Sequence, residues 1–351
     1  MEGSAHVGGR RGPGTNGRPG APTLEMVAEA AGVSRATVSR VVNGSPKVRP
    51  DVARQVRDAI RALNYVPNRA ARSLAGRHTY ALALIVPEDT SRFFGDPYFA
   101  AITRGITRRL DDSDYILNLL VASADPDHKT LRYLQGGNVD GAFVVSHHSG
   151  DTHLAGVADS VPLVLGGRPY LDALRDCYYV DVDNVAGAGV ATRHLIDRGR
   201  RRIGTVTGPA DMPAAADRLT GWRDAMAAAG LDDRARVAGD FTLPGGARAA
   251  RMLLDRHPEL DAIFVANDLM AAGVLSAVLD RGLRVPDDLA LVGYDDSPAA
   301  IAGEVALTTV RQPSERMGAT MADYLLGLLA DEPPADRACI LQTELVVRDS
   351  S

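Results

Sequence analysis

The chain lacks the sequence features of several protein classes. Its 351 residues include only two cysteines, Cys177 and Cys339, which lie far apart and form no Cys-x-x-Cys pair. We therefore expect neither a disulfide framework nor a structural zinc site, which fits a reducing cytoplasm. No run approaches the roughly 18 apolar residues of a membrane span. Residues 1–22 are rich in Gly, Pro and Arg, without the apolar segment of a secretory signal, and we expect a disordered tail there.

The motifs of common enzyme classes are also missing. No Gly-x-Gly-x-x-Gly follows a strand-like run, and there is no Walker A loop or Gly-x-Ser-x-Gly elbow. Two lysines in the whole chain leave little scope for Schiff-base chemistry. His147, His148 and His153 lie near Asp151, which could indicate a metal, but their Ser- and Gly-flanked segment is more simply interpreted as a solvated loop. We expect no enzyme, no metal and no cofactor.

Charge is present but unevenly distributed. The net charge is -5, which taken alone argues against a nucleic-acid partner. Residues 1–80, however, hold 13 Arg and Lys against 5 Asp and Glu, so the remainder of the chain is strongly acidic. A basic head on an acidic body indicates that one part of the protein meets phosphate and the other does not.

The hydrophobic pattern changes along the chain and predicts the domains. Residues 23–66 are helical in pattern, whereas apolar strand-like runs alternate with helical segments of roughly 10–15 residues from Tyr80 onward. Such alternation predicts an α/β core of Rossmann-like parallel sheets, and the many strands favour two lobes. The predicted strands are Ala81–Val86, Ile116–Val121, Gly141–Val145, Leu163–Gly166, Tyr179–Val182, Ile203–Thr207, Ala262–Ala266 and Leu289–Gly293.

We accordingly divide the chain into four parts, written as residue ranges. These are a tail (1–22), an all-α helix-turn-helix domain (23–67), a hinge (68–78) and a two-lobed core (79–351). The first lobe is expected at about 79–181 and 310–329, and the second at about 182–309 and 330–349. The chain would then cross between the lobes near residues 182, 309 and 330. No leucine heptads follow Ile340, so an added tetramerisation coil is not expected.

The head has the pattern of a DNA-reading helix-turn-helix. Thr23 can cap a helix that runs to Ala31, Gly32 supplies the sharp turn, and Ser34 can cap a second helix that runs to about Asn43. A third helix, predicted from Pro50 to Leu63, covers the first two with an apolar stripe. The second helix buries its valines and presents a polar face suited to the major groove. The candidate DNA contacts in the head are Thr23, Ser34, Arg35, Ala36, Thr37, Ser39, Arg40 and Asn43.

The same residues carry a resemblance to a known family. The segments TLEMVAEAAGVS (23–34), ATVSRVVN (36–43), LNYVPN (63–68) and ARSLAG (71–76) resemble the LacI/GalR family of repressors, and the resemblance extends nearly to the C-terminus. It implies a hinge that becomes ordered when two copies meet on DNA, with Asn68 and Ala71 near the duplex. Leu74 matches the apolar wedge that such proteins push between base steps in the minor groove. Without the family match, Leu74 would be an ordinary linker residue.

The core is better interpreted as a binding cleft, since ligands of such sheets sit beyond the carboxyl ends of the strands. The resemblance implies that Arg218, Asn267 and Asp295 hydrogen-bond sugar hydroxyls and that Phe241 stacks on the sugar. The other candidates are Asp96, Tyr98 and Phe99 from the first lobe and Asp183, although Asp183 could merely cap a helix and Phe99 could belong to the core. Many relatives place a carboxylate where Gly167 falls, so the identity of the ligand stays open.

Together these features predict a cytoplasmic, nucleoid-associated repressor. A homodimer would read a near-palindromic operator, and a small sugar between the lobes would control its affinity. Sugar-responsive relatives usually release DNA on binding ligand, but the sequence does not fix the sign. A regulator with a purine-like co-repressor is an alternative. A sugar-binding protein without a DNA role and a sugar-modifying enzyme are further alternatives, which an export signal or a catalytic acid and base pair would favour.

Overall fold

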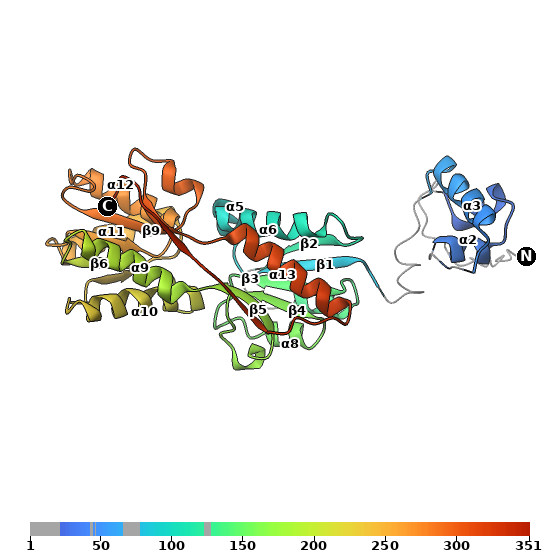
Figure 1. Ribbon diagram of the computed structural model, residues 1–351, viewed down its shortest axis with the longest axis horizontal. Coiled ribbons are helices and arrows are strands. Elements are labelled where there is room, and N and C mark those ends of the chain that lie inside the picture. Colours follow the sequence, from blue (N-terminus) through green and yellow to red (C-terminus); the bar gives the residue numbers. More distant parts are fainter. Residues whose placement is uncertain (1–21, 43–44, 46, 66–77, 123–127) are drawn as a thin grey trace, which may run out of the picture. The chain divides into compact units, whose positions relative to one another are not determined.

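The computed structural model describes residues 22–42, 45, 47–65, 78–122 and 128–351. It divides between Thr79 and Tyr80 into two compact units, an N-terminal unit and a core (Figure 1). Among the described residues, none of the helices has the length and apolarity that crossing a bilayer requires.

The N-terminal unit consists of three helices, α1 (Leu24–Ala30), α2 (Arg35–Val42) and α3 (Pro50–Ala62). Thr23 Oγ1 accepts a hydrogen bond from Met26 N at 3.3 Å, and Ser34 Oγ accepts one from Thr37 N at 3.2 Å, so both predicted caps are present. Gly32 has the positive φ of 61° that the turn requires. The centre of this unit is formed by the fully buried Val27, Val38 and Val56, while Val41 and Val42 are only half-buried.

The first lobe of the core is built on a six-stranded, wholly parallel sheet in the order β11-β5-β4-β3-β1-β2. Its strands are β1 (Ala81–Val86), β2 (Ile116–Val121), β3 (Gly141–Val145), β4 (Leu163–Gly166), β5 (Tyr178–Val182) and β11 (Ala338–Leu341). The elements around it are α5 (Thr90–Gly95), α6 (Pro97–Leu110), α7 (Lys129–Gln135), α8 (Leu154–Ala158), η1 (Asp172–Leu174) and α13 (Ser314–Leu329).

The second lobe repeats this plan with the order β12-β10-β9-β8-β6-β7, in which only β12 is antiparallel. Its strands are β6 (Ile203–Thr207), β7 (Arg236–Ala238), β8 (Ala262–Val265), β9 (Ala290–Asp295), β10 (Thr308–Arg311) and β12 (Glu344–Val346). The elements around it are α9 (Asn184–Asp197), α10 (Pro213–Ala228), α11 (Leu243–Arg256), α12 (Asp268–Asp280) and η2 (Pro298–Ile301).

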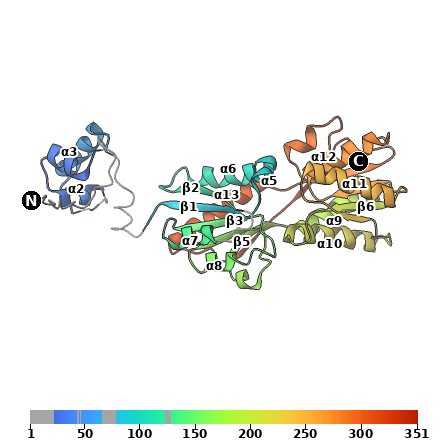
Figure 2. The ribbon, with the colours of Figure 1, turned by 180° about the vertical axis from the view of Figure 1, so that it is seen from behind.

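Helices cover both faces of each sheet, as Figures 1 and 2 show from opposite sides. Strand β1 is buried along its whole length, because its alternate side chains enter separate apolar clusters on the two faces of the first sheet. The second sheet is likewise enclosed by two clusters. Each of the eight predicted strands is present, five with the predicted ends and three with an end shifted by one or two residues.

The two lobes are connected by three chain crossings. The chain passes from β5 to α9, from β10 to α13, and from β11 to β12. Helix α13 packs closely on α6, since a Cβ added at Gly105 would lie 1.9 Å from the carbonyl oxygen of Glu315.

The last crossing corrects the predicted lobe boundary. We expected residues 330–349 in the second lobe, but β11 pairs with β5 of the first sheet, with Ile340 opposite Asp181. The crossing therefore lies after Leu341 rather than near residue 330. Strand β11 is short and buries only Leu341, so its sequence gives little sign of which sheet it joins.

Candidate functional site

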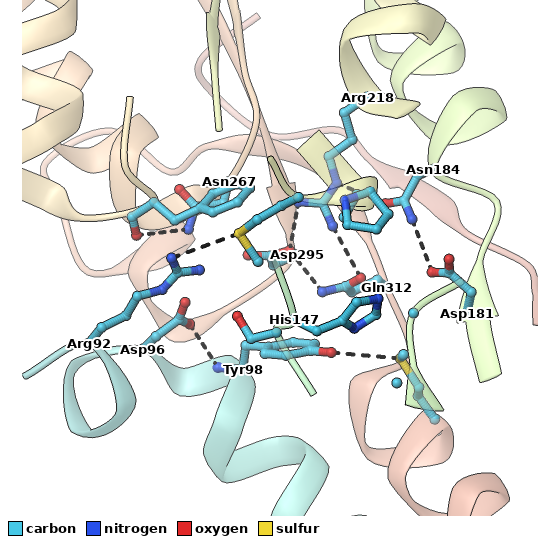
Figure 3. A pocket seen from close by; sticks show the side chains of 18 residues that line it. Arg92, Asp96, Tyr98, His147, Asp181, Asn184, Arg218, Asn267, Asp295 and Gln312 are labelled. Atoms are coloured by element: carbon cyan, nitrogen blue, oxygen red, sulfur yellow. Dashed lines mark hydrogen bonds and ion pairs between the residues drawn. The ribbon is translucent and has the colours of Figure 1, made fainter. Parts of the chain in front are cut away.

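A cavity lies between the two lobes at the carboxyl ends of the strands (Figure 3). The first lobe contributes Asp96 and Tyr98, and the second contributes Arg218, Asn267 and Asp295. The volume of the cavity that is open to the centre of a water-sized sphere is about 80 Å³. A small, partly apolar space with a few convergent polar groups is the usual form of a small-molecule site.

Arg218, on α10, lies at the centre of the polar wall and is held by four groups. Its Nε donates to Asn184 Oδ1 at 2.9 Å, and its Nη1 donates to the carbonyl oxygen of Ala266 at 2.6 Å. Its Nη2 donates to Gln312 Oε1 at 3.3 Å, and its guanidinium lies 3.7 Å from the ring centre of Tyr294. A 5% exposed cation with this many partners is fixed in orientation.

Asp295 faces Arg218 across the cavity wall. Its Oδ1 lies 3.5 Å from Arg218 Nη1 and accepts a hydrogen bond from Gln312 Nε2 at 2.9 Å. Burial raises the pKa of Asp295 well above its usual range, and the charge of Arg218 offsets only part of this rise. A ligand hydroxyl that donates to this carboxylate would therefore relieve a real desolvation cost.

Asn267 and Phe241 form a connected pair on the second lobe. Asn267 Oδ1 caps α12 by accepting from Met270 N at 2.9 Å, and its Nδ2 donates to the carbonyl oxygen of Phe241 at 3.2 Å. Phe241 has a φ of 61°, a conformation that is uncommon outside glycine. Positive φ values recur in the cavity lining at Ser146 (62°) and Asp295 (112°), so strained backbone clusters at this site.

The first lobe contributes Asp96 and Tyr98 from the start of α6. Asp96 Oδ1 accepts from Tyr98 N at 3.0 Å and so caps the helix, while burial raises the pKa of its carboxyl group. The Tyr98 hydroxyl lies 4.0 Å from the sulfur of Met317, and burial also raises the pKa of Tyr98. Six of the eight predicted ligand contacts thus line one cavity.

The other two, Phe99 and Asp183, do not line it. Phe99 is 2% exposed and packs in the first-lobe core against Phe93, with ring centres 5.3 Å apart. Asp183 caps α9 by accepting from Ala186 N at 2.8 Å. Phe99 follows Tyr98 on a helix, so its side chain turns away from the face that Tyr98 presents.

Several lining residues were missed in the sequence. Asp181 and Asn184 lie on either side of the predicted Asp183, and Ser146 directly follows β3, so strand ends were a usable signal. Gln312 follows β10, a strand that we did not predict. Arg92 lies in the short helix α5, and nothing else in the sequence around it indicates a ligand contact. The missed side chains that line the cavity are those of Arg92, Ser146, His147, Asp181, Asn184, Met212, Pro213, Ala214, Gln312 and Met317.

The histidine segment is not the solvated loop that we expected. His147 is 3% exposed and lines the cavity, and its Nε2 lies 3.1 Å from the carbonyl oxygen of Arg168. His148 lies 3.2 Å from Glu88 of the first lobe and 2.9 Å from Asp211 of the second. The hydrogen bonds to Glu88 and then Asp211 raise the pKa of His148 to about 9, against the opposing effect of partial burial. Charged His148 therefore ties the lobes together.

A second tie between the lobes is formed by Arg168 and Asp217. Arg168 Nε and Nη2 donate to the two carboxylate oxygens of Asp217 at 2.7 and 2.6 Å, which is the bidentate geometry of a strong pair. The backbone N–H of Arg168 donates to the buried Asp181 at 2.8 Å. The tie is thus anchored on the cavity lining of the first lobe.

In the N-terminal unit, the residues expected at DNA form a largely exposed set. Thr23, Ser34, Arg35, Ala36 and Arg40 are exposed, whereas Thr37 and Ser39 are half-buried on α2. Arg35 lies 3.1 Å from Glu25, an exposed pair that contributes little to stability. The predicted contacts Asn43, Asn68, Ala71 and Leu74 lie outside the described residues.

Comparisons with known proteins place this architecture. Residues 23–68 match the family described as bacterial regulatory proteins, lacI family, and residues 192–351 match a periplasmic binding protein-like domain. The HTH-type transcriptional regulator CelR of Thermobifida fusca is 44% identical over 334 residues, which cover 94% of this chain and 98% of that protein. The chain belongs to the LacI family. This LacI-family protein is a transcriptional regulator and not an enzyme, and the predicted family and fold class are confirmed.

Solved structures agree with that assignment. The structure of a CelR–cellobiose complex matches with a TM-score of 0.75 and 42% identity, covering 94% of this chain and all of that one. The lac repressor dimer bound to operator and the anti-inducer ONPF matches with a TM-score of 0.82 and 28% identity, covering 94% and 99% of the two chains. The ribose operon repressor of Escherichia coli K12 is 34% identical over 310 residues, which cover 87% of this chain and 92% of that one.

Proposed function

We propose that this LacI-family regulator is a repressor that binds a near-palindromic operator as a homodimer and is released by a small sugar bound between the core lobes. The sugar is a short β-linked glucoside of the cellobiose type. The observation that carries the proposal is the fixed pair of Arg218 and Asp295 inside a cavity that Phe241 also lines. Planar polar groups beside an aromatic ring suit a ligand with hydroxyls on its edge and C–H groups on its face. The CelR–cellobiose complex supports the choice of sugar.

In this proposal, α2 of each subunit enters the major groove of one half-site. Arg35 and Arg40 then contact guanine edges, with Ala36 and Ser39 beside them on the same helix. Thr23, Ser34, Thr37 and Asn43 contact phosphates at the edges of the groove. The hinge, residues 68–78, places Asn68 and Ala71 near the duplex and Leu74 in the minor groove. The protein then acts on the chromosome, in the nucleoid.

Control by sugar follows from the position of the cavity. A ligand that hydrogen-bonds to Arg218 on one lobe and Asp96 on the other changes the relative stability of lobe arrangements, and a change in the hinges alters affinity for DNA. The coupling expected for such a switch is roughly 1–3 kcal/mol. Asp183, which caps α9 at the first crossing, would act on the connection between the lobes rather than on the ligand.

The decisive experiment measures operator binding with and without sugar. Fluorescence anisotropy on selected inverted-repeat duplexes should show tight binding that cellobiose weakens, while guanine and hypoxanthine have no effect. Tighter binding with a purine would favour the co-repressor alternative. Sugar turnover, or equal affinity for random duplex under every condition, would overturn the proposal.

The first prediction tests the pocket separately from the head. Asp295→Ala should abolish the cellobiose response while operator affinity stays within about twofold, because the change lies in the core. The readouts are isothermal titration calorimetry for the sugar and anisotropy for the operator. Asp280→Ala, an exposed carboxylate on the same lobe, is the matched control and should respond normally. A normal response of Asp295→Ala would refute the assignment of the pocket.

A further inference from the structure

A second, larger cavity adjoins the one described above. It lies between α5 of the first lobe and the start of α11 of the second, and it shares Arg92, Asp96 and Phe241 with the inner cavity. The volume open to the centre of a water-sized sphere is about 660 Å³ here, against about 80 Å³ in the inner cavity. The two spaces thus share a wall, and the outer one has by far the greater capacity.

The shared wall consists of Arg92 stacked on Phe241. The Arg92 guanidinium lies 5.1 Å from the ring centre, and its Nη1 lies 3.1 Å from Glu88, which orients it. On the second lobe the Phe241 ring packs over Gly208, where an added Cβ would lie 2.1 Å from Cζ. One side of the stack therefore belongs to each lobe, and any change in the distance between the lobes opens or closes it.

Arg92 also has an unused donor. Its Nε is buried and has no hydrogen-bond partner among the described residues, and the side chain as a whole is 10% exposed. A buried N–H without an acceptor carries a desolvation cost, so an oxygen of a ligand that opens the shared wall would be bound favourably there. This unpartnered donor indicates that a ligand at the wall has an oxygen there.

The outer cavity carries the chemistry of a sugar site. Arg248 Nη2 donates to Asp240 Oδ2 at 2.7 Å, and Asp240 Oδ1 accepts from the Thr242 hydroxyl at 2.6 Å, so paired planar charged groups lie on one side. Leu243 is 47% exposed and provides an apolar surface beside them. A carboxylate and a guanidinium next to an apolar surface match a pyranose ring, as they do in the inner cavity.

We propose that the outer cavity is a second sugar subsite, which holds a glycosyl unit of an oligosaccharide whose end occupies the inner cavity. The linkage passes the Arg92–Phe241 wall, and Arg92 Nε donates to the ligand there. Arg248 and Asp240 bind the outer ring. The subsite makes the regulator select for chain length, and this inference rests on the proposed function of the inner cavity.

The test is a calorimetric series of glucose, cellobiose and cellotriose on the full chain. The proposal expects one step in the series, at the ring that enters the outer cavity, to raise affinity about tenfold, the effect of one or two hydrogen bonds to charged groups. Arg248→Ala should shrink that step at least threefold. Arg251→Ala, on the same helix and paired with Asp280 outside the cavity, is the matched control and should keep the step.

A second variant acts by size rather than by charge. Leu243→Trp fills part of the outer cavity and should remove the step, even if Arg248→Ala proves silent. Measurable binding of a shorter sugar, with no step anywhere or with a step that neither variant changes, would overturn the second subsite and leave the proposed function standing. If no sugar in the series binds, both the proposed function and the subsite fail.

Discussion

The two lobes contribute to the inner cavity in different ways. The second lobe supplies side chains that are fixed within it: Arg218, Asn267 and Asp295 are held largely by groups of their own lobe or of the neighbouring crossing segment. The first lobe instead supplies the ties that cross the cavity, from His148 and Arg168 to carboxylates of the second lobe. The second lobe is therefore the preorganised half of the site, and in the proposed switch the first lobe is the half that closes on it.

The largest expected effect of a substitution concerns the preorganised half of the site, the second lobe. Arg218→Met removes the cation that faces Asp295 and leaves a buried carboxylate unpaired, which costs roughly 3–5 kcal/mol of unfolding free energy. Urea unfolding measures the loss, and calorimetry should find no sugar binding. Arg223→Met, on the same helix with its charge in a half-exposed pair, is the control and should change stability by less than about 1 kcal/mol. Equal effects of the two variants would mean that Arg218 is not part of a preorganised half.

A smaller effect is expected for a substitution in the first lobe, the half that closes in the proposed switch. Arg168→Gln removes the bidentate tie to Asp217. The Arg168 side chain is 40% exposed, so the free energy of unfolding should change little. Affinity for cellobiose should fall roughly threefold to tenfold, because the closed arrangement loses a contact that the open one lacks. Calorimetry on Arg168→Gln, Asp217→Asn and the double variant tests this. Fully additive losses would show that the two side chains do not act as a pair.

The smallest effect is a pH dependence from His148. Its pKa is raised to about 9 in the folded protein, from an ordinary value near 6.5. Stabilisation by the protonated ring is fully present below pH 6.5 and is lost as the pH rises through about 9. Sugar affinity should decline over that window, with Glu88, Arg92, Asp151 and Asp211 as the charged groups around the ring.

The control for this pH dependence is the variant His148→Gln, which keeps hydrogen-bonding capacity without a titrating charge. Its affinity for cellobiose should be nearly constant between pH 6.5 and 9.5, whereas His153→Gln, in the same segment, should behave like the unchanged protein. A decline of the same size in His148→Gln would assign the pH dependence to another group.

Local patterns made much of this structure predictable. The caps Thr23 and Ser34 and the turn at Gly32 follow from rules that involve only neighbouring residues, and they were placed correctly. Asp295 ends a buried strand-like run at the edge where parallel strands end, and the family resemblance then singled out both Arg218 and Asp295, which line the cavity. What the sequence expresses locally, in a few consecutive residues, it therefore predicts well.

The errors concern relations between distant segments. Nothing near Gln312 shows that it reaches both Arg218 and Asp295, because β10 is a short strand whose neighbours come from elsewhere in the chain. The burial of His147 depends on the position of Arg168, and the choice between Asp181 and Asp183 depends on which way one strand end turns. Such features are set by tertiary packing, which overrides local preference.

Strand β11 has a consequence for how the protein comes to be folded. The edge of the first sheet is supplied by residues 338–341, more than 150 positions after its partner β5, and β12 completes the second sheet only a few residues later. Neither half can thus finish its sheet while the chain is still being synthesised up to that point. The halves reach their final form almost simultaneously, so a newly made molecule gains both walls of its ligand chamber in one late event.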